Sequence, residues 1–342
     1  MINLISDTVT KPTHQMLNYM MQSEVGDDVF HEDPSVNHLE SKVASMFGKE
    51  AAIFCPSGTM TNQIAIKMHT QPLDEVICDV NSHIYQYETA GYAFNSGVGI
   101  KLIQGKNGKI TPDMLSHMVN QDYEWLPRTR LVVLENTNNK AGGTIYRLRE
   151  VKKIASFCRE HGLKLHLDGA RLFNALVETG EKTEAWGQVF DSISICMSKG
   201  LGAPIGSLLI GTHEDIKMAR RYRKVMGGGM RQAGYLAAAC TYALDNHVDR
   251  LKQDNDRAKE VAAVLKKAKY VGRIRPVQTN IIIFDLKGNR TASWFLDVLK
   301  KKKITASAFG PQTVRFTFHL DISPRDISRL KRVLSNENLF RV

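Results

Sequence analysis

Short apolar runs rich in Val, Ile and Leu alternate with helical or loop patterns from about residue 50 to residue 211. Runs of this kind are typical of strands in a sheet that is covered on both faces, and helices between them favour parallel crossovers. The pattern therefore predicts an α/β domain with a mostly parallel sheet. Its expected strands cover residues 51–55, 76–79, 100–104, 131–135, 165–168, 193–197 and 207–210.

The last third of the chain carries a different pattern. From residue 232 to 269 helix breakers are few and apolar residues recur at helical spacing, which predicts a long helical stretch leading into a second unit. Beyond it we expect strands over 279–286 and 314–318 and helices over 294–299 and 327–334. These elements predict a smaller α+β domain at the end of the chain.

Composition identifies an ordinary globular protein. Apolar residues make up 43% of the 342 residues and charged residues 24%, which excludes a disordered or collagen-like chain. The formal net charge is +11, from 46 Lys and Arg against 35 Asp and Glu, and it keeps nucleic-acid binding open as an alternative. We interpret the basic run over 300–303 as the solvated end of a helix, where cations are favourable.

Cysteine usage and apolar run length bear on the location of the protein. The five cysteines include no CxxC pair, and most have apolar or small neighbours, which is typical of reduced thiols in a core. No 18 consecutive apolar residues occur, and residues 1–14 lack an apolar signal-peptide core. We therefore expect a cytoplasmic protein with no membrane partner.

The segment Pro56-Ser57-Gly58-Thr59 lies between an expected strand and a helical pattern. A strand, a small-residue turn and a helix N-terminus present free backbone N–H groups and the positive end of the helix dipole, which together bind phosphate. The same residues also make an ordinary helix N-cap. This segment alone leaves both interpretations open.

Two further segments end strands of the expected parallel sheet. Asp168 closes the strand over 165–168, at the edge where open α/β sheets bind ligands, and can hold a proton on a heterocyclic nitrogen or cap the next helix. Lys199 follows the strand over 193–197 and precedes Gly200, so it is partly desolvated, which favours the neutral amine as a nucleophile. A lysine in an ordinary surface turn is the alternative.

Together these segments provide a phosphate-binding turn, a carboxylate for a ring nitrogen and an amine for an aldehyde. Pyridoxal phosphate needs these protein groups: the lysine forms a Schiff base, and the aspartate keeps the ring protonated so that it accepts electrons. We therefore predict pyridoxal phosphate as the cofactor. We assign no metal ligands.

With these motifs in place, the chain resembles the threonine aldolases, which belong to the fold-type I pyridoxal-phosphate enzymes and to the group that includes β-eliminating lyases. The resemblance implies a transferase-like α/β fold with a smaller C-terminal α+β domain. We expect a segment over 1–15 that contributes to the active site, a large domain over 16–245 and a small domain over 246–342. The other motifs that carry the resemblance are Leu4-Ile5-Ser6-Asp7-Thr8-Val9-Thr10, Val25-Gly26-Asp27-Asp28-Val29, Glu32-Asp33-Pro34, Glu135-Asn136-Thr137 and Met226-Gly227-Gly228-Gly229-Met230-Arg231-Gln232-Ala233-Gly234.

The resemblance implies roles for the residues around the cofactor. Lys199 forms the Schiff base, Asp168 pairs with the pyridine nitrogen, and His83 stacks on the ring. The turn over 57–59 binds phosphate. In similar enzymes, basic residues that flank the Gly-Gly-Gly loop reach a phosphate in the neighbouring subunit, which implies a dimer as the minimal unit and usually a homotetramer. The candidates here are Lys224, or its neighbour Arg223, and Arg231.

The substrate of such an enzyme is an amino acid, whose carboxylate needs a planar cation that stays charged. Arg171 and Arg315 fit this role, with the Ser6 hydroxyl as a further donor, and Arg171 also counts as cofactor-binding. Apolar residues alternate along 314–318, so Arg315 projects from the face opposite Val314. An exposed strand arginine gives the same pattern.

The resemblance implies retro-aldol cleavage of L-threonine, L-allo-threonine and related β-hydroxy-α-amino acids to glycine and an aldehyde. We expect His83, with Glu88, to remove the hydroxyl proton, because an imidazole titrates near neutrality. A β-eliminating lyase is the alternative on the same scaffold, and a regulatory or nucleic-acid-binding protein is a more distant one. Asn138 replaces a frequent histidine, which leaves the threonine or allo-threonine preference open. Phe30-His31 replaces a frequent Tyr-Gly, so we expect different contacts with the aldehyde side of the substrate.

Overall fold

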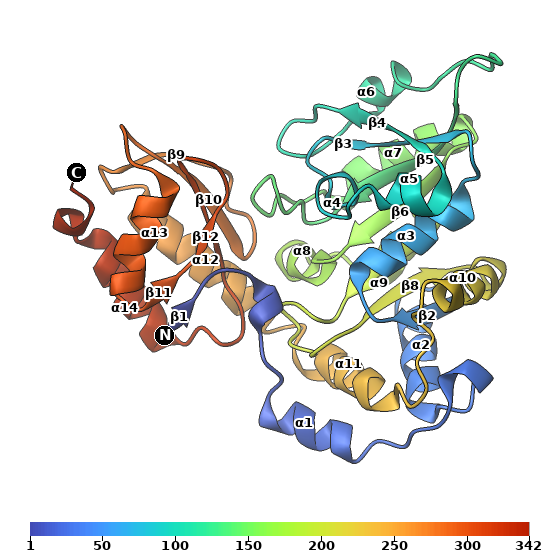
Figure 1. Cartoon of the computed structure of the whole chain (residues 1–342), viewed down its shortest axis with the longest axis horizontal. Coiled ribbons are helices and arrows are strands. Elements are labelled where there is room, and N and C mark those ends of the chain that lie inside the picture. The colour runs from blue at the N-terminus through green and yellow to red at the C-terminus, as the bar shows by residue number, and fades with distance from the viewer. Residues whose placement is uncertain (342) are drawn as a thin grey trace.

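The computed structural model describes residues 1–341, and its largest element is a seven-stranded sheet in the order β2-β8-β7-β6-β5-β3-β4 (Figure 1). Neighbouring strands are parallel except at β8, which runs antiparallel to both β2 and β7. The mostly parallel sheet and all seven expected strands are thus confirmed. The strands are β2 (Ala51–Cys55), β3 (Asp74–Asp79), β4 (Gly99–Ile103), β5 (Arg128–Glu135), β6 (Lys164–Gly169), β7 (Ser192–Cys196) and β8 (Ser207–Gly211).

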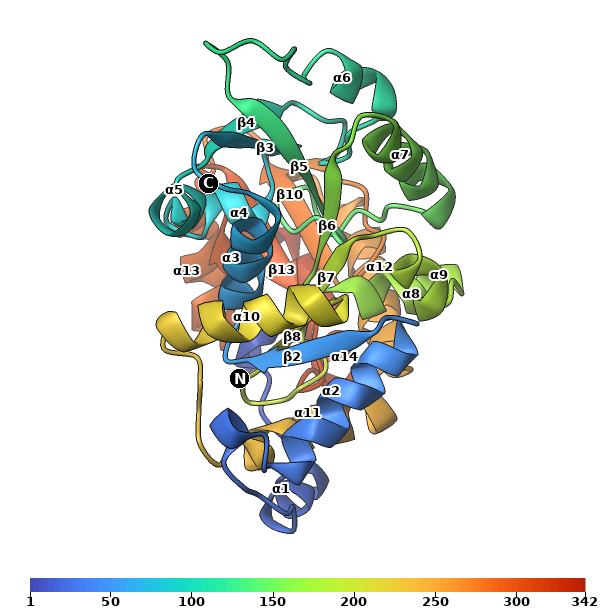
Figure 2. The same cartoon turned by 90° about the vertical axis from the view of Figure 1, so that its right-hand side faces the viewer.

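Helices cover both faces of this sheet (Figure 2). Side chains of β8 alternate between the two layers. On β8, Leu208 and Ile210 join the main hydrophobic cluster with residues of α2 and α11, while Leu209 packs with α3 and α10 on the other face. The continuous apolar runs of the sequence follow from this double cover. These helices are α2 (Pro34–Met46), α3 (Gly58–His69), α7 (Leu148–Glu160), α8 (Leu172–Thr179), α10 (His213–Val225) and α11 (Gly234–Asn246).

The C-terminal part forms a four-stranded antiparallel sheet in the order β12-β13-β10-β9, with helices against it. Ile2 and Leu4 belong to its hydrophobic cluster, because β1 (Ile2–Asn3) pairs with β11 (Ile304–Thr305). The start of the chain therefore lies beside this α+β unit (Figure 1). The expected strands and helices are present as β10 (Ile281–Leu286), β13 (Thr313–Thr317), α13 (Ala292–Lys301) and α14 (Pro324–Ser335), joined by the unexpected short strands β9 (Val271–Ile274) and β12 (Ser307–Ala308).

The expectation of one long helical stretch over 232–269 is wrong in one respect, because the structure has two helices there. α11 ends at Asn246, and α12 (Leu251–Leu265) begins after a short turn. His247 lies at this break, where its Nδ1 is hydrogen-bonded to the carbonyl oxygen of Leu201 at 2.7 Å. α11 packs on α1 (His14–Met21) and α2, whereas α12 packs on α8 and α14. The domain limits stay a prediction.

Two smaller expectations from the sequence are confirmed. All five cysteines are buried and free. Lys300 and Lys301 lie in the last turn of α13, where cations favour the helix dipole. No helix within residues 1–341 combines the length and the apolar character needed to cross a bilayer.

Candidate active site

The carboxyl edge of the parallel sheet holds a fixed carboxylate. The buried Asp168, one residue before the end of β6, accepts hydrogen bonds on both oxygens. Nδ2 of Asn62 donates to Oδ2 at 2.9 Å, and the backbone N–H of Ala170 donates to Oδ1 at 3.1 Å. Since α8 begins only at Leu172 and has no side-chain cap, Asp168 does not cap that helix. Its position is that of a ligand-binding residue in an α/β sheet.

His83 and Glu88 lie next to Asp168, and polar side-chain atoms of the three residues lie within 4.8 Å of one another. Nδ1 of His83 is 2.9 Å from Oε1 of Glu88. The buried Glu88 also accepts from the side-chain amides of Asn62 at 2.9 Å and Gln63 at 2.6 Å. Burial lowers the pKa of His83, but the hydrogen bond to Glu88 and the charge of Asp168 raise it by more.

The amine of Lys199 lies near the first turn of α3. Its Nζ donates to Sγ of Cys196 at 3.3 Å, and a Cβ atom on Gly58 would lie only 2.5 Å from the same sulfur. A larger residue than glycine would displace that sulfur. The Ser57 hydroxyl caps α3, while the N–H groups of Gly58 and Thr59 have no partner among the described residues. A phosphate can therefore bind at these N–H groups, close to the lysine.

Arg171 and Arg315 lie close enough for their charges to interact. Asp7 holds Arg171, because its two oxygens accept from Nε and Nη2 at 2.7 Å each. Burial alone would raise the pKa of Asp7, but Arg171 outweighs it and, with the charge of Lys199, lowers the pKa to about 2. Burial and the charge of Arg171 lower the pKa of Arg315 to about 10. Two guanidinium groups that repel each other beside a lysine favour a bound carboxylate.

Glu135, at the end of β5, links Arg315 to His83. Arg315 donates to Oδ1 of Asn139 at 3.0 Å and to the carbonyl oxygen of Ile5 at 2.9 Å. Glu135 in turn accepts from the backbone N–H groups of Asn139 at 2.8 Å and His83 at 2.9 Å. Burial is the largest of the effects that raise the pKa of Glu135 to about 7. One buried carboxyl group thus positions residues on both sides of the site.

Lys224 and Arg231 form no hydrogen bond or ion pair with this cluster within residues 1–341. Both are exposed, and Arg231 pairs with Asp27 at 2.8 Å. The neighbouring Arg223 is buried instead and pairs with Asp28 at 2.7 Å. Arg223 therefore forms its ion pair within its own chain, whereas Lys224 and Arg231 are exposed to solvent and accessible to a partner molecule.

Two residues singled out in the sequence, Ser6 and Asn138, have local hydrogen-bond partners, and a third, His31, has an unusual backbone conformation. Oγ of Ser6 accepts from the N–H of Thr8 at 3.2 Å and from its hydroxyl at 2.8 Å, so Ser6 keeps its own proton to donate. Asn138 is buried, and its Oδ1 accepts from the N–H of Ala141 at 2.9 Å. His31 has a φ of 62°, a left-handed conformation that suits glycine better.

Sequence reasoning assigned no role to Asp7, Asn62, Glu135 or Asn139, although each contacts a candidate site residue. Asp7 and Glu135 lie within motifs that carried the family resemblance, so those motifs already marked both residues as candidates for the site. Asn62 and Asn139 had no local signal, because their contacts arise only when distant segments meet in the fold.

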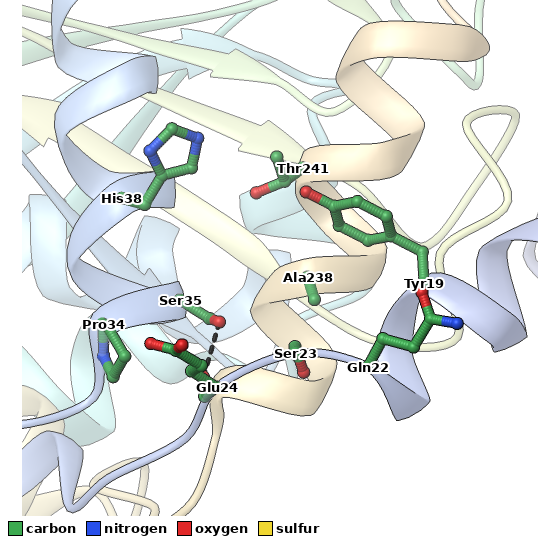
Figure 3. Close-up of a pocket in the computed structure, with 9 residues that line it drawn as sticks. All are labelled: Tyr19, Gln22, Ser23, Glu24, Pro34, Ser35, His38, Ala238 and Thr241. Carbon is green, nitrogen blue, oxygen red and sulfur yellow. Dashed lines mark hydrogen bonds between the residues drawn. The ribbon is translucent and has the colours of Figure 1, made fainter.

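A cavity elsewhere in the molecule contains none of these residues. It has a volume of about 460 Å³ and lies between α1, α2 and α11 (Figure 3). At one end the hydroxyl of Ser35 donates to the carbonyl oxygen of Glu24 at 2.7 Å. The candidate site is therefore identified by its chemistry and not by cavity volume. The cavity is lined by Tyr19, Gln22, Ser23, Glu24, Pro34, Ser35, His38, Ala238 and Thr241.

The residues present fit pyridoxal phosphate. The N–H groups that begin α3, which have no partner among residues 1–341, suit its phosphate. Asp168 suits a protonated ring nitrogen, and the Lys199 amine suits the aldehyde. His83, beside Asp168, has the planar ring that stacking requires.

Comparisons with known proteins agree with this chemistry. The family model described as "Beta-eliminating lyase" matches residues 3–289. A low specificity L-threonine aldolase of Escherichia coli O157:H7 is 40% identical over 331 residues, which cover 96% of this chain and 97% of that protein. A solved structure of Leishmania major threonine aldolase shares the fold, with a TM-score of 0.85 over 98% of both chains at 22% identity. The chain therefore belongs to the beta-eliminating lyase family, in its threonine aldolase branch.

Proposed function

We propose that this protein is a carbon–carbon lyase that uses pyridoxal phosphate to cleave L-threonine, L-allo-threonine and related β-hydroxy-α-amino acids to glycine and an aldehyde. The observation that carries the proposal is the position of Lys199. Its amine forms no ion pair within residues 1–341, and it lies close enough to the Arg171–Asp7 pair to lower the pKa of Asp7. The names of the relatives favour the same activity.

The protein groups around Lys199 match the parts of the cofactor. When bound, pyridoxal phosphate supplies an electron-accepting ring joined to the substrate amine. The N-terminus of α3 binds the phosphate, and Asp168 holds the proton of the ring nitrogen. Because Asp168 is paired in register with Ser194 of β7, the carboxylate and the lysine that follows β7 lie on adjacent strand ends.

Arg171 and Arg315 bind and orient the substrate carboxylate. Arg171 is fixed by Asp7, and Arg315 by Asn139 and by a backbone carbonyl, so neither guanidinium needs to be ordered when substrate arrives. Fixing the carboxylate would also fix the rotation about the N–Cα bond of the substrate and so select which bond to Cα is cleaved. In this proposal that bond joins Cα to Cβ. The Ser6 hydroxyl is a further donor.

His83 takes the proton of the substrate β-hydroxyl group. Its Nδ1 is engaged by Glu88 at 2.9 Å, which leaves Nε2 as the atom that accepts the proton. The Glu88 carboxylate stabilises the imidazolium that forms. Hydrogen bonds from the side-chain amides of Asn62 and Gln63 keep this carboxylate in place beside His83. In this arrangement Glu88 orients the base and does not act as the base itself.

The proposed assembly is at least a dimer, with a homotetramer expected, and its active sites are shared. Lys224 and Arg231 support this proposal, because they are exposed and form no hydrogen bond or ion pair with the site of their own chain within residues 1–341. In a dimer they reach the phosphate bound by the partner subunit. A cytoplasmic location is proposed with it, from the buried, free cysteines.

Purification followed by a spectrum and an aldolase assay tests the proposed function. We expect yellow protein that releases acetaldehyde and glycine from L-threonine or L-allo-threonine, whereas β-elimination would give a keto acid and ammonia. Lys199→Ala should abolish both colour and turnover, because no other residue supplies the amine. Lys153→Ala, which alters an exposed lysine of α7, is the matched control and should keep both. Full activity of Lys199→Ala would refute the assignment.

A further inference from the structure

A buried chain of hydrogen bonds connects Asn62 to three residues to which the proposed function gives no role. His69 Nε2 and His166 Nδ1 each lie 2.8 Å from the hydroxyl oxygen of Ser192. Nε2 of His166 lies 3.2 Å from Oδ1 of Asn62. All four side chains are more than nine-tenths buried. We call His69, Ser192 and His166 the histidine relay.

The amide nitrogen of Asn62 serves two carboxylates at once. Nδ2 lies 2.9 Å from Oδ2 of Asp168 and 2.9 Å from Oε1 of Glu88, so both of its protons are donated. If the amide were reversed, its oxygen would face two carboxylate oxygens and be repelled. The two carboxylates therefore fix the amide orientation, with Oδ1 towards His166.

This orientation sets the direction of every other hydrogen bond in the relay. Because Oδ1 of Asn62 only accepts, His166 donates from Nε2, and its Nδ1 accepts the hydroxyl proton of Ser192. The Ser192 oxygen then accepts from Nε2 of His69. Burial is the main cause that lowers the pKa of His166 to about 3 and the pKa of His69 to about 4, so both rings stay neutral, as this pattern requires.

We propose that Asn62 is a positioning residue, held in place by the histidine relay, that holds the carboxylates of Asp168 and Glu88 side by side. Without its two donated hydrogen bonds, nothing would offset the repulsion between the two carboxylates, and they would move apart. Asp168 would then hold the cofactor ring proton less well, and Glu88 would hold Nδ1–H of His83 less well. This inference rests on the proposed function and assigns residues beyond it.

Asn62→Asp tests the proposal, because it keeps the size of the side chain and removes the paired donor. At saturating pyridoxal phosphate we expect kcat for L-threonine to fall at least about tenfold, because Asp168 would be displaced from the cofactor ring and Glu88 from His83. KM should change less than about twofold, since both arginines still bind the substrate carboxylate. The visible absorbance band of the loaded enzyme should shift with the ring proton, a readout that needs no turnover.

A matched control separates this effect from loss of any buried asparagine. Asn255→Asp alters a fully buried residue of α12 that is hydrogen-bonded to Asn174 and, within residues 1–341, forms no hydrogen bond with Asn62 or the relay. We expect its absorbance band and its kcat, measured per bound cofactor, to match those of the wild type. If kcat fell as much in Asn255→Asp as in Asn62→Asp, the proposal would be overturned.

His166→Leu and His166→Gln separate positioning from packing. Glutamine still offers a donor to Asn62 and should keep kcat within about threefold, whereas leucine offers none and should behave like Asn62→Asp. If the leucine variant does not fold, Ser192→Ala removes only the hydroxyl and should shift the spectrum the same way. Wild-type spectra and kcat in Asn62→Asp and in the relay variants would overturn the proposal. A wild type that binds no cofactor would instead refute the proposed function.

Discussion

Two ion pairs of similar length differ in the water that surrounds them. Asp7 and Arg171 lie 2.7 Å apart, with side chains 0% and 7% exposed, whereas Asp27 and Arg231 lie 2.8 Å apart, with side chains 20% and 55% exposed. Separating the first pair strands a buried charge, but separating the second only returns two groups to water. The buried arginine is therefore fixed in place within the proposed substrate site, and the exposed arginine is free to change partners.

Asp7→Asn breaks the buried pair and gives the largest expected effect. Arg171 loses its counter-charge without a change in packing, so we expect the free energy of unfolding to fall by about 3–5 kcal/mol. Urea denaturation at neutral pH measures this loss. In the wild type, the pKa of Asp7 is lowered to about 2, so its stabilising contribution is present above the ordinary Asp pKa and disappears as the pH falls towards 2. A loss below about 1 kcal/mol would contradict the contrast between the pairs.

The buried and the exposed charges were also unequally predictable from the sequence. Lys199 and Asp168 could be identified because each follows or ends an apolar run, and the ends of parallel strands meet at one edge. The Asp7–Arg171 pair could not, because 164 residues separate its partners and only the fold joins them. Arg223 and Lys224 looked equivalent as neighbouring bases. Their positions around α10 distinguish them, because one side chain points into the core and the other into solvent.

The histidine relay extends the comparison to buried groups that stay neutral. Burial lowers the pKa of His166 to about 3 and that of His69 to about 4, so below pH 6.5 the unfolded chain binds protons that the folded chain does not. Stability therefore falls as the pH drops, by about 2 kcal/mol per histidine between pH 7 and pH 5. Urea denaturation at both pH values should show that the free energy of unfolding falls less between pH 7 and pH 5 in His69→Gln than in the wild type. His117→Gln, at an exposed histidine, is the matched control.

Arg231→Ala should have the smallest effect on stability and still decide whether the active site is shared. Removing the exposed pair with Asp27 costs less than about 1 kcal/mol of unfolding free energy, which urea denaturation measures. Turnover should nevertheless fall if Arg231 reaches the phosphate of a partner subunit. The variant thus separates the structural contribution of this arginine from its proposed functional one.

Mixing Arg231→Ala with Lys199→Ala tests that sharing directly. If the sites are shared as proposed, each variant alone lacks a complete site, because one has no partner arginine and the other no amine. A hybrid dimer would then have one complete site, formed by Lys199 of the first variant and Arg231 of the second. Random pairing makes half of the dimers hybrids, so about a quarter of the wild-type activity should return after co-refolding or co-expression. If Arg231 served its own chain, no hybrid would hold a complete site and the mixture would stay as inactive as its components.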